Sequence, residues 1–417
     1  MSLDTEKLAI VKSSAPVLKE NSTEIGKRFY ELLFTKVPEL CNIFNQTNQK
    51  RGFQQEALVY AVYAAGENID KLENINQLVE RIAEKHVSLG VEPEQYPIVG
   101  KVLIQAVQDV LGDAATDDVI EAWGTAYDYI ANLFIEIEQK KYHETEQQDG
   151  GWTGFREFVV DETIQETNDV VSFCLKPKDG QPISPYKAGQ YLTIKADIDG
   201  EPHTHMRQYS LSGPSGKGYY KISVKREKGH GEVPDGIVST YLHDQVSEGD
   251  TLEFSAPAGD FTITSEKDPI VLLSGGIGLT PVVGMLETLA EKEPERPVTF
   301  IHATQNSSAH AMKAHIEQIA EGHSNISSFV CYDSPNDKDR ESRNFDKEGF
   351  VDLPWLQSIL SCGNDADFYC CGPAPFMKAV DKGLKEWGIS SAKRHYELFN
   401  PLSILNEANE DKEAAVL

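Results

Sequence analysis

The chain has 417 residues, of which 40% are hydrophobic and 25% charged, a composition typical of globular proteins with two or three domains. Its formal net charge is −27, and because nucleic acids and anionic membranes bind basic surfaces, neither is an expected partner. Residues 1–14 lack the basic segment and apolar core of a secretory signal, and no apolar run approaches the roughly 20 residues that span a bilayer. We therefore expect a cytoplasmic protein with no stable membrane association.

The six cysteines form no C-x-x-C pair and no Cys/His spacing of the kind that holds zinc or an iron–sulfur cluster. In a cytoplasmic chain, free reduced thiols are the expected state. Thiolate metal centres are thus not expected.

The first third of the chain, residues 1–145, is predicted to form an all-α domain of six or seven helices. Apolar residues recur at i, i+3, i+4 and i+7 in the segments 8–20, 26–38, 53–69, 75–90, 96–111 and 116–142. Asn21-Ser22 and Thr116-Asp117 supply N-capping side chains. Alternating runs of β-branched residues are missing.

Two stretches of this domain resemble the flavohaemoglobin family. The sequence FYELLF (29–34), followed by PEL and NIFNQTNQ, resembles the family's B-helix and CD corner. The sequence KH (85–86), followed by PEQYPIVG (93–100), resembles the side from which the haem iron is ligated. A lone histidine in a helix is usually a surface or core residue, so the order and spacing of these motifs carry the inference.

The resemblance implies that His86 is the axial ligand of a haem b iron, because neutral imidazole supplies the strong nitrogen ligand that haem iron needs. The other residues implied to line the haem pocket are Tyr30, Phe44, Gln54, Leu58 and Lys85. The Tyr30 hydroxyl would donate to bound O₂ and stabilise negative charge on it.

The resemblance also implies a tyrosine and a glutamate behind the ligand. A ligating histidine usually donates its other ring N–H to an acceptor that fixes the tautomer. Tyr96 fits the tyrosine, and Glu138 fits the glutamate, with Glu136 on the same helix as the alternative. A carboxylate there would make the imidazole electron-rich, which favours activating bound O₂ over storing it.

The polar stretch 139–151 ends in Gly150-Gly151 and is predicted to be the boundary to a β-rich domain. Strand-like segments follow at 156–164, 170–177, 190–198, 206–213, 219–227 and 250–259. Their spacing indicates an antiparallel barrel or sandwich, with a short helix starting in 241–246.

The tetrad Arg207-Gln208-Tyr209-Ser210 lies at the start of one of these strands and resembles the flavin-binding signature of the ferredoxin reductase family. Arginine offers a fork of donors for the FAD pyrophosphate, a tyrosine ring can pack on the isoalloxazine, and serine can reach its N5 edge. The upstream AGQYLTI resembles the same family and implies Tyr191 as a further FAD contact.

From residue 269 apolar strands alternate with helices, which predicts a doubly wound parallel sheet. The loop GGIGLTP (275–281) follows the first strand. Glycines let a backbone approach a ligand, helix N-terminal N–H groups attract a pyrophosphate, and Pro281 is predicted at the first helical position. The loop is neither G-x-G-x-x-G nor a Walker motif.

This loop and YCCGPAPFM (369–377) resemble the nicotinamide dinucleotide signatures of the ferredoxin reductase family. The contacts implied for NADH or NADPH are Gly275, Gly276, Ile277, Gly278, Leu279, Thr280, Cys371, Gly372 and Pro373. We expect Cys370 to lie in the core and Cys371 to line the pocket. The segment HATQNSSAH lacks an arginine for a 2′-phosphate, which favours NADH.

Near the end, HYELFNP (395–401) resembles the family's E-x-F-G-P motif, whose aromatic covers the second face of the flavin. The implied FAD contacts are Leu398, Phe399, Asn400 and Pro401. Asn400 replaces the glycine of the motif, and asparagine tolerates a left-handed backbone better than most residues.

Together the resemblances imply a globin haem domain (1–145), an FAD-binding β-barrel (150–264), an NAD(P)-binding α/β domain (265–401) and a polar, acidic tail (402–417). The implied activity is nitric oxide dioxygenation, in which electrons pass from NAD(P)H through FAD to haem, and NO and O₂ become nitrate. Two alternatives stay open: an oxygen carrier or sensor, and an NAD(P)H-dependent reductase of other acceptors such as peroxides. We expect a monomer whose partners are O₂ and NO.

Overall fold

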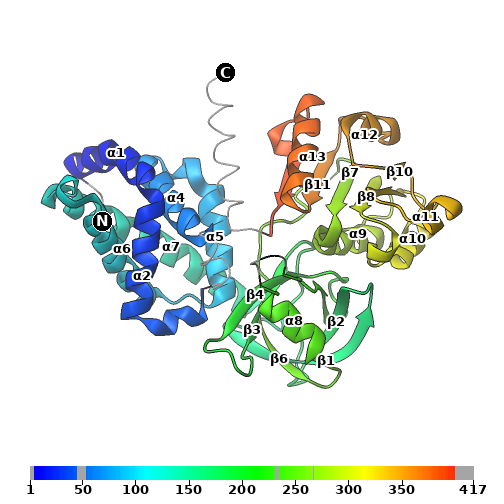
Figure 1. Ribbon diagram of the computed structural model, residues 1–417, viewed down its shortest axis with the longest axis horizontal. Coiled ribbons are helices and arrows are strands. Elements are labelled where there is room, and N and C mark those ends of the chain that lie inside the picture. The colour runs from blue at the N-terminus through cyan, green and yellow to red at the C-terminus, as the bar shows by residue number, and fades with distance from the viewer. Residues whose placement is uncertain (1–3, 45–52, 230, 232–233, 266, 400–417) are drawn as a thin grey trace.

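The computed structural model describes residues 4–44, 53–229, 231, 234–265 and 267–399. It divides in chain order into an α-helical unit, an antiparallel β unit and an α/β unit, so the predicted fold class is confirmed. Figure 1 shows the helical unit on the left, the β unit below and the α/β unit on the right.

The helical unit packs its helices around one apolar core. Its helices are α1 (Thr5–Glu20), α2 (Ser22–Lys36), α4 (Phe53–Glu67), α5 (Asn76–Leu89), α6 (Tyr96–Leu111) and α7 (Asp117–Gln147), with short 3₁₀ turns between several of them. Val11, Leu33, Ala106 and Ala122 have no exposed surface. The apolar residues that recur at helical spacing therefore bury one face of each helix, as expected.

Two local predictions in this unit were wrong in detail. Asn21 stands before α2 but makes no cap bond there; its Nδ2 instead donates to Val17 O, 2.9 Å away, at the end of α1. Helix α7, predicted over 116–142, continues to Gln147, further into the polar stretch 139–151. Lys141 Nζ on this helix lies 2.7 Å from a carboxylate oxygen of Glu84 on α5, which ties the polar end of α7 to the helical unit.

The β unit is an antiparallel sheet whose two edges come together. Its strands are β1 (Phe155–Gln165), β2 (Val170–Pro177), β3 (Tyr191–Ala196), β4 (His205–Ser210), β5 (Tyr220–Lys225) and β6 (Thr251–Ser255), in the order β4-β3-β6-β1-β2-β5. An antiparallel bridge between Leu211 and Ile222 joins the end of β4 to β5, which fits a barrel. Helix α8 (Ile237–Asp244) starts four residues before the predicted segment 241–246.

The α/β unit is a parallel sheet in the order β10-β9-β8-β7-β11-β12. Its elements are β7 (Ile270–Gly275), α9 (Leu279–Lys292), β8 (Val298–Thr304), α10 (Lys313–Gly322), β9 (Ile326–Tyr332), α11 (Asp337–Ser342), β10 (Lys347–Glu348), α12 (Leu353–Ile359), β11 (Asp367–Cys371), α13 (Ala374–Glu386) and β12 (Arg394–Glu397). Helix α11 and the two-residue β10 had no counterpart in the sequence prediction. Helix α10 begins only at Lys313 because Met312, with φ of 56°, is left-handed and ends the preceding turn.

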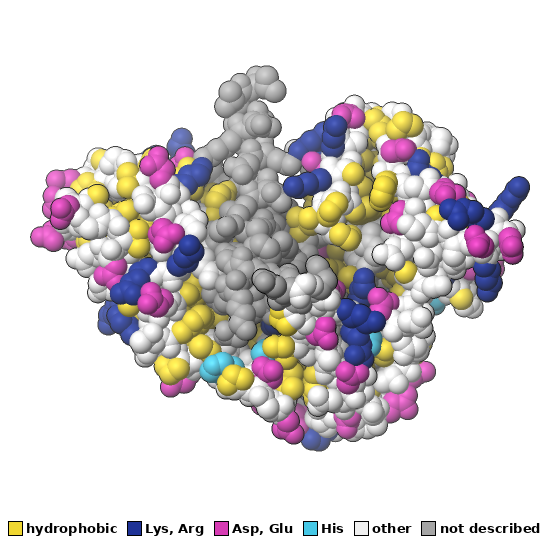
Figure 2. All heavy atoms as spheres, viewed as in Figure 1, with side chains coloured by type: hydrophobic (Ala, Val, Ile, Leu, Met, Phe, Trp, Pro, Cys, Tyr) yellow, Lys and Arg dark blue, Asp and Glu magenta, His cyan; other side chains and the backbone are white. Residues whose placement is uncertain are grey.

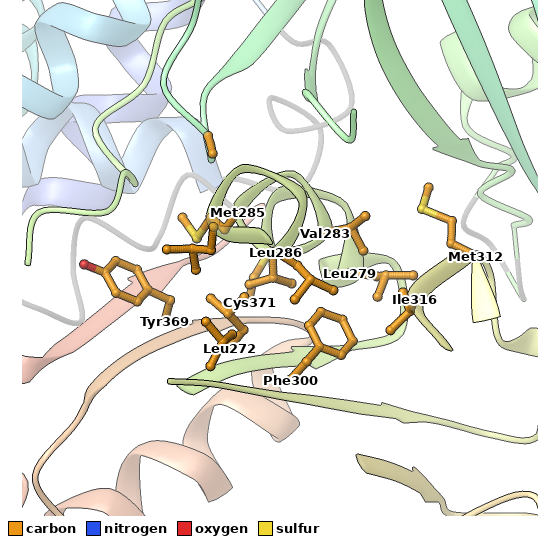
Figure 3. Close-up of a cluster of buried hydrophobic side chains, with 14 of the residues drawn as sticks. Leu272, Leu279, Val283, Met285, Leu286, Phe300, Met312, Ile316, Tyr369 and Cys371 are labelled. Atoms are coloured by element: carbon orange, nitrogen blue, oxygen red, sulfur yellow. The ribbon is translucent and has the colours of Figure 1, made fainter. Parts of the chain in front are cut away.

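Helix α9 packs on the centre of this sheet. Figure 3 shows Leu272, Phe300 and Cys371 from the sheet facing Leu279, Val283 and Leu286 of α9. All of these side chains are at most 1% exposed. This dry layer fixes the N-terminus of α9 against the carboxyl ends of β7 and β11.

Acidic side chains are not gathered in one patch on the face shown in Figure 2. On the face shown in Figure 2, Asp and Glu side chains are spread over all three units and are interspersed with Lys and Arg. None of the described helices combines the length and apolarity needed to cross a bilayer. All six cysteines belong to the described residues and are free thiols, as expected.

Candidate active site

A cavity of about 470 Å³ opens between the helical unit and the barrel and extends to β12. This volume falls in the range of roughly 300–1,000 Å³ that small-molecule sites occupy. Most of its wall is apolar and comes from α2, α4, α5, α6 and α7, while β3, β4 and residues 397–399 supply the remainder. The segments singled out in the first, second and last thirds of the sequence thus meet around one space.

His86 reaches this cavity from the last turn of α5. Its Nδ1 lies 2.7 Å from Glu138 Oε1 on α7 and 3.0 Å from the Tyr96 hydroxyl at the start of α6. The Tyr96 hydroxyl in turn donates to the same Oε1 over 2.5 Å. Helices α5, α6 and α7 therefore bring together three side chains that are far apart in the sequence.

The hydrogen bonds of this triad fix the state of the imidazole. Burial, followed by the charge and the hydrogen bond of Glu138, raises the pKa of Tyr96, so this phenol keeps its proton and donates it to the carboxylate. The remaining contact to Glu138 must then carry a proton on His86 Nδ1. In the neutral imidazole this arrangement leaves the lone pair on Nε2, which has no hydrogen-bond partner among the described residues, and this tautomer ligates a metal through Nε2.

Glu138 and Glu136 have different surroundings. Glu138 is 3% exposed, whereas Glu136 points from the same helix into solvent. The contact with the histidine is made by Glu138 alone of the two. The choice left open by the sequence is therefore decided by the turn of α7.

Aromatic and aliphatic side chains of α2, α4 and the turn after α2 form another part of the cavity wall. Tyr30 is 4% exposed, and its ring packs edge-on against Phe44, with 5.4 Å between ring centroids. Leu58 on α4 also lines the cavity. The side chain of Gln54 lies outside the described residues. The apolar enclosure and the free imidazole nitrogen together fit a haem, which needs one nitrogen ligand and a dry pocket.

Charged groups gather where the cavity passes from the helical unit to the barrel. Lys85, Arg207 and Glu397 all line this part. Burial lowers the pKa of Lys85; the charge of Glu397 raises it and that of Arg207 lowers it further. Burial also lowers the pKa of Arg207. Two half-buried cations beside one carboxylate make this region suited to an anionic group of a cofactor.

The flavin-type motifs of the barrel lie on adjacent strands. Tyr191 on β3 pairs in register with Ser210 on β4, and both line the cavity, as do Arg207 and Gln208. Tyr209 does not belong to the lining; it is half-buried and packs against the barrel core. Its packing on a flavin ring stays a prediction.

The segment after β12 reaches the same cavity from the other end of the chain. Leu398 and Phe399 line it, and Phe399 is 55% exposed, so its ring offers an open aromatic face. Asn400 and Pro401 lie outside the described residues. Glu397 also lines the cavity but was not singled out from the sequence. It is the glutamate of the E-x-F motif, so the motif contained the signal that would have identified it.

The two dinucleotide motifs interlock at the carboxyl edge of the parallel sheet. A Cβ on Gly278 would collide with the backbone carbonyl of Cys371, and a Cβ on Gly372 would lie 3.1 Å from the Gly275 backbone. Gly276, with φ of 52°, has open space around it. The glycines thus let α9 approach β11 while leaving the loop accessible, as a pyrophosphate site requires.

Two predictions for these motifs were wrong. Pro281 is the third residue of α9 rather than the first, still within the turn whose N–H groups lack helical partners. Cys371 has no exposed surface and packs among the side chains shown in Figure 3, so it does not line an open pocket. Cys370 is equally buried, as expected.

No group of three or more His, Cys, Asp or Glu residues in the described chain could hold a bare metal ion. A haem needs no such group because its porphyrin supplies most of the iron ligands. Sequence reasoning missed the contacts between the helical unit and the barrel, in particular Glu84, Ser88 and Thr193. Small polar residues in good helices and strands give no signal for such a contact.

Comparison with known proteins gives matches along the whole chain. Family models match residues 27–133 (globin), 157–263 (oxidoreductase FAD-binding domain) and 272–382 (oxidoreductase NAD-binding domain). The chain is 51% identical to the flavohemoprotein of Halalkalibacterium halodurans, covering 97% of this chain and 98% of that protein. It is 46% identical to the flavohemoprotein of Bacillus subtilis, covering 96% and 98%.

Solved structures agree. The crystal structure of flavohemoglobin from Malassezia yamatoensis with bound FAD and heme matches with a TM-score of 0.83 at 29% identity, covering 96% of this chain and all of that one. The FAD/NAD-binding domain of nitric oxide dioxygenase from Vibrio cholerae matches with a TM-score of 0.53 at 36% identity, covering 58% of this chain and 98% of that one.

Proposed function

Because the chain belongs to the flavohemoprotein family, we propose that it is an NAD(P)H-dependent nitric oxide dioxygenase that converts NO and O₂ to nitrate. Its globin, FAD-binding and NAD-binding domains make it an oxidoreductase with haem, FAD and a nicotinamide nucleotide as cofactors. When bound, the nucleotide and FAD supply electrons and the haem supplies the oxygen chemistry. The name of the Vibrio cholerae relative of the reductase half supports NO as substrate.

The observation that carries the proposal is the buried triad of His86, Tyr96 and Glu138. A histidine that donates Nδ1–H to a carboxylate is a more basic, electron-rich ligand than one bonded to a neutral acceptor. Oxygen storage does not need such a ligand, nor does it need a continuous supply of electrons. The triad and the attached reductase therefore favour turnover over carriage.

The remaining lining residues receive roles that follow from their chemistry. We assign Tyr30 as the hydroxyl that stabilises negative charge opposite His86. Phe44 and Leu58 exclude water from that side. Lys85 and Arg207 would meet anionic groups of the cofactors, since both line the cavity between the helical unit and the barrel.

The flavin and dinucleotide contacts remain proposals at the residue level. Tyr191 and Phe399 would enclose the flavin from the barrel and from the chain end, with Gln208 and Ser210 at its edge. The interlocked glycine loop would hold the nucleotide pyrophosphate. The domain limits given above, a cytoplasmic location and a monomeric state also stay predictions.

The test is NO consumption by the purified, haem- and FAD-loaded protein with NADH, measured with an NO electrode in air-saturated and in anaerobic buffer. We expect rapid uptake that requires both O₂ and NADH, with nitrate as product. Uptake no faster than that of NADH with free FAD and haem would refute the proposal. If the protein then binds O₂ reversibly, the carrier or sensor function replaces it.

The same triad also favours cleavage of an O–O bond, so a peroxide reductase is the second candidate. Its test is NADH oxidation with an alkyl hydroperoxide in the absence of O₂. A kcat/KM for the peroxide above that for NO would favour this function.

A further inference from the structure

A row of buried hydroxyl groups crosses the interface between the helical unit and the barrel. Ser88 lies on α5 close behind His86 and is 1% exposed, and Thr193 on β3 has no exposed surface. Thr193 Oγ1 donates to Ser88 Oγ over 3.0 Å, and Ser88 Oγ donates to Lys85 O over 2.8 Å. Because each hydroxyl has one proton to give, these bonds run in one direction, from barrel to helix.

Both ends of this row belong to the candidate active site. At the barrel end, Gln208 of the flavin-type tetrad donates through Nε2 to Thr193 Oγ1 over 3.2 Å. At the helix end, the accepting carbonyl belongs to the peptide bond that joins Lys85 to His86. The row therefore links the flavin-facing strands to the backbone of the iron ligand.

The other polar contacts between these two units are less buried. Arg81 Nε lies 3.3 Å from Asp260 Oδ2, but the two side chains are 28% and 35% exposed, and exposed ion pairs contribute little. Glu84 Oε2 accepts from the Gly259 N–H over 2.8 Å at a part-buried site. Loss of a fully buried hydroxyl leaves its partner without water as a substitute, which costs more than breaking an exposed pair.

We propose that Ser88 and Thr193 are positioning residues for electron delivery from the flavin to the haem. Their hydrogen bond holds α5 against β3 and β4 in the arrangement through which electrons cross. NADH supplies two electrons to the flavin, and each ferric haem accepts one of them; no bond to the protein forms or breaks. The inference rests on the electron route of the proposed function and not on NO as the substrate.

The test uses the full-length protein loaded with haem and FAD, mixed with NADH without O₂ in a stopped-flow spectrophotometer. Flavin absorbance reports reduction of FAD, and the Soret band reports reduction of the haem. Thr193→Val removes the hydroxyl, Thr193→Ser keeps it, and Ser88→Ala removes the same bond from the helix side. The matched control is Ser172→Ala, which removes a buried 2.7 Å hydroxyl bond to Ser223 inside the barrel.

We expect Thr193→Val and Ser88→Ala to slow haem reduction by about tenfold. The reason is that one unsatisfied buried hydroxyl lowers the ratio of docked to undocked domains by about this factor. Reduction of FAD by NADH should stay unchanged, and Thr193→Ser and Ser172→Ala should behave like the parent protein. This combination separates domain positioning from a general loss of stability.

Three results would overturn the inference: haem reduction in Thr193→Val equal to that in Ser172→Ala, an equal loss in Thr193→Ser, or a parallel loss of FAD reduction by NADH. Should Thr193→Val fail to fold, Ser88→Ala decides on the same criteria. Slow haem reduction in a protein whose parent consumes no NO would support this inference while refuting the proposed function.

Discussion

Replacing Glu138 by glutamine should raise the reduction potential of the haem iron. The substitution keeps the shape of the side chain but removes a negative charge that lies 2.7 Å from His86 Nδ1. A carboxylate there stabilises the ferric state, which carries one more positive charge than the ferrous state. Losing it therefore makes the iron easier to reduce.

The size of the rise follows from the change in one hydrogen bond. A bond to a charged acceptor contributes about 1.5–3 kcal/mol and a bond to a neutral one about 0.5–1.5 kcal/mol, so Glu138→Gln weakens it by about 1–1.5 kcal/mol. For a one-electron couple, 59 mV corresponds to about 1.4 kcal/mol, so the expected rise is at most about 40–65 mV, the value reached when the whole weakening falls on the ferric state.

The assay is a spectroelectrochemical titration of the Soret band, with Glu136→Gln as the matched control. Glu136 lies on the same helix but is exposed, so water and salt screen its charge and the potential should not move. A potential for Glu138→Gln within error of the parent protein would refute the reasoning. So would an equal shift in the control, because the effect would then be one of net charge.

Three further predictions address the other units. His86→Ala should lose the Soret band of bound haem but keep NADH-dependent reduction of a dye through FAD; loss of both activities would contradict the separation of the domains. Gly278→Ala places a methyl group against a backbone carbonyl of β11, at a cost of about 1–3 kcal/mol, so FAD reduction by NADH should slow. The control Gly322→Ala adds a methyl group in open space and should leave the rate unchanged. Burial lowers the pKa of His302 to about 3 and that of His310 to about 2, so below pH 6.5 only the unfolded chain gains these protons. The free energy of unfolding should therefore fall by about 1.4 kcal/mol per pH unit for each histidine, down to its folded pKa. In urea unfolding between pH 4 and 7, the free energy of unfolding of His310→Gln should depend less steeply on pH, and an unchanged pH dependence would be contrary evidence.

Periodicity was sufficient for the fold class. A 3.6-residue period in the first third predicted helices, and short alternating segments in the middle predicted antiparallel strands. Apolar strands in the last third predicted a buried parallel sheet, and the structure has each of these units in that order. The glycine loop was also found by pattern, because its residue types answer a local backbone need, whereas the C-G-P motif came from resemblance to a family.

Contacts between distant elements could not be predicted in this way. Tyr96 and Glu138 are 42 residues apart and Ser88 and Thr193 are 105 apart. The first pair came only from resemblance to a family, and the second pair gave no signal at all.

The outer face of α5 has a consequence for how the two halves of the protein are joined. Arg81, Glu84 and Ser88 follow one another at helical spacing and meet the barrel through polar contacts rather than an apolar core. Such a surface is that of a transient electron-transfer complex, which separate proteins form only weakly. Here residues 148–154 tie α7 to β1, and a short tether of this kind sustains an effective concentration on the order of millimolar. Covalent connection thus takes the place of affinity. We expect the haem half, once released by cleavage of the linker, to stay soluble and to bind its reductase only at high concentration.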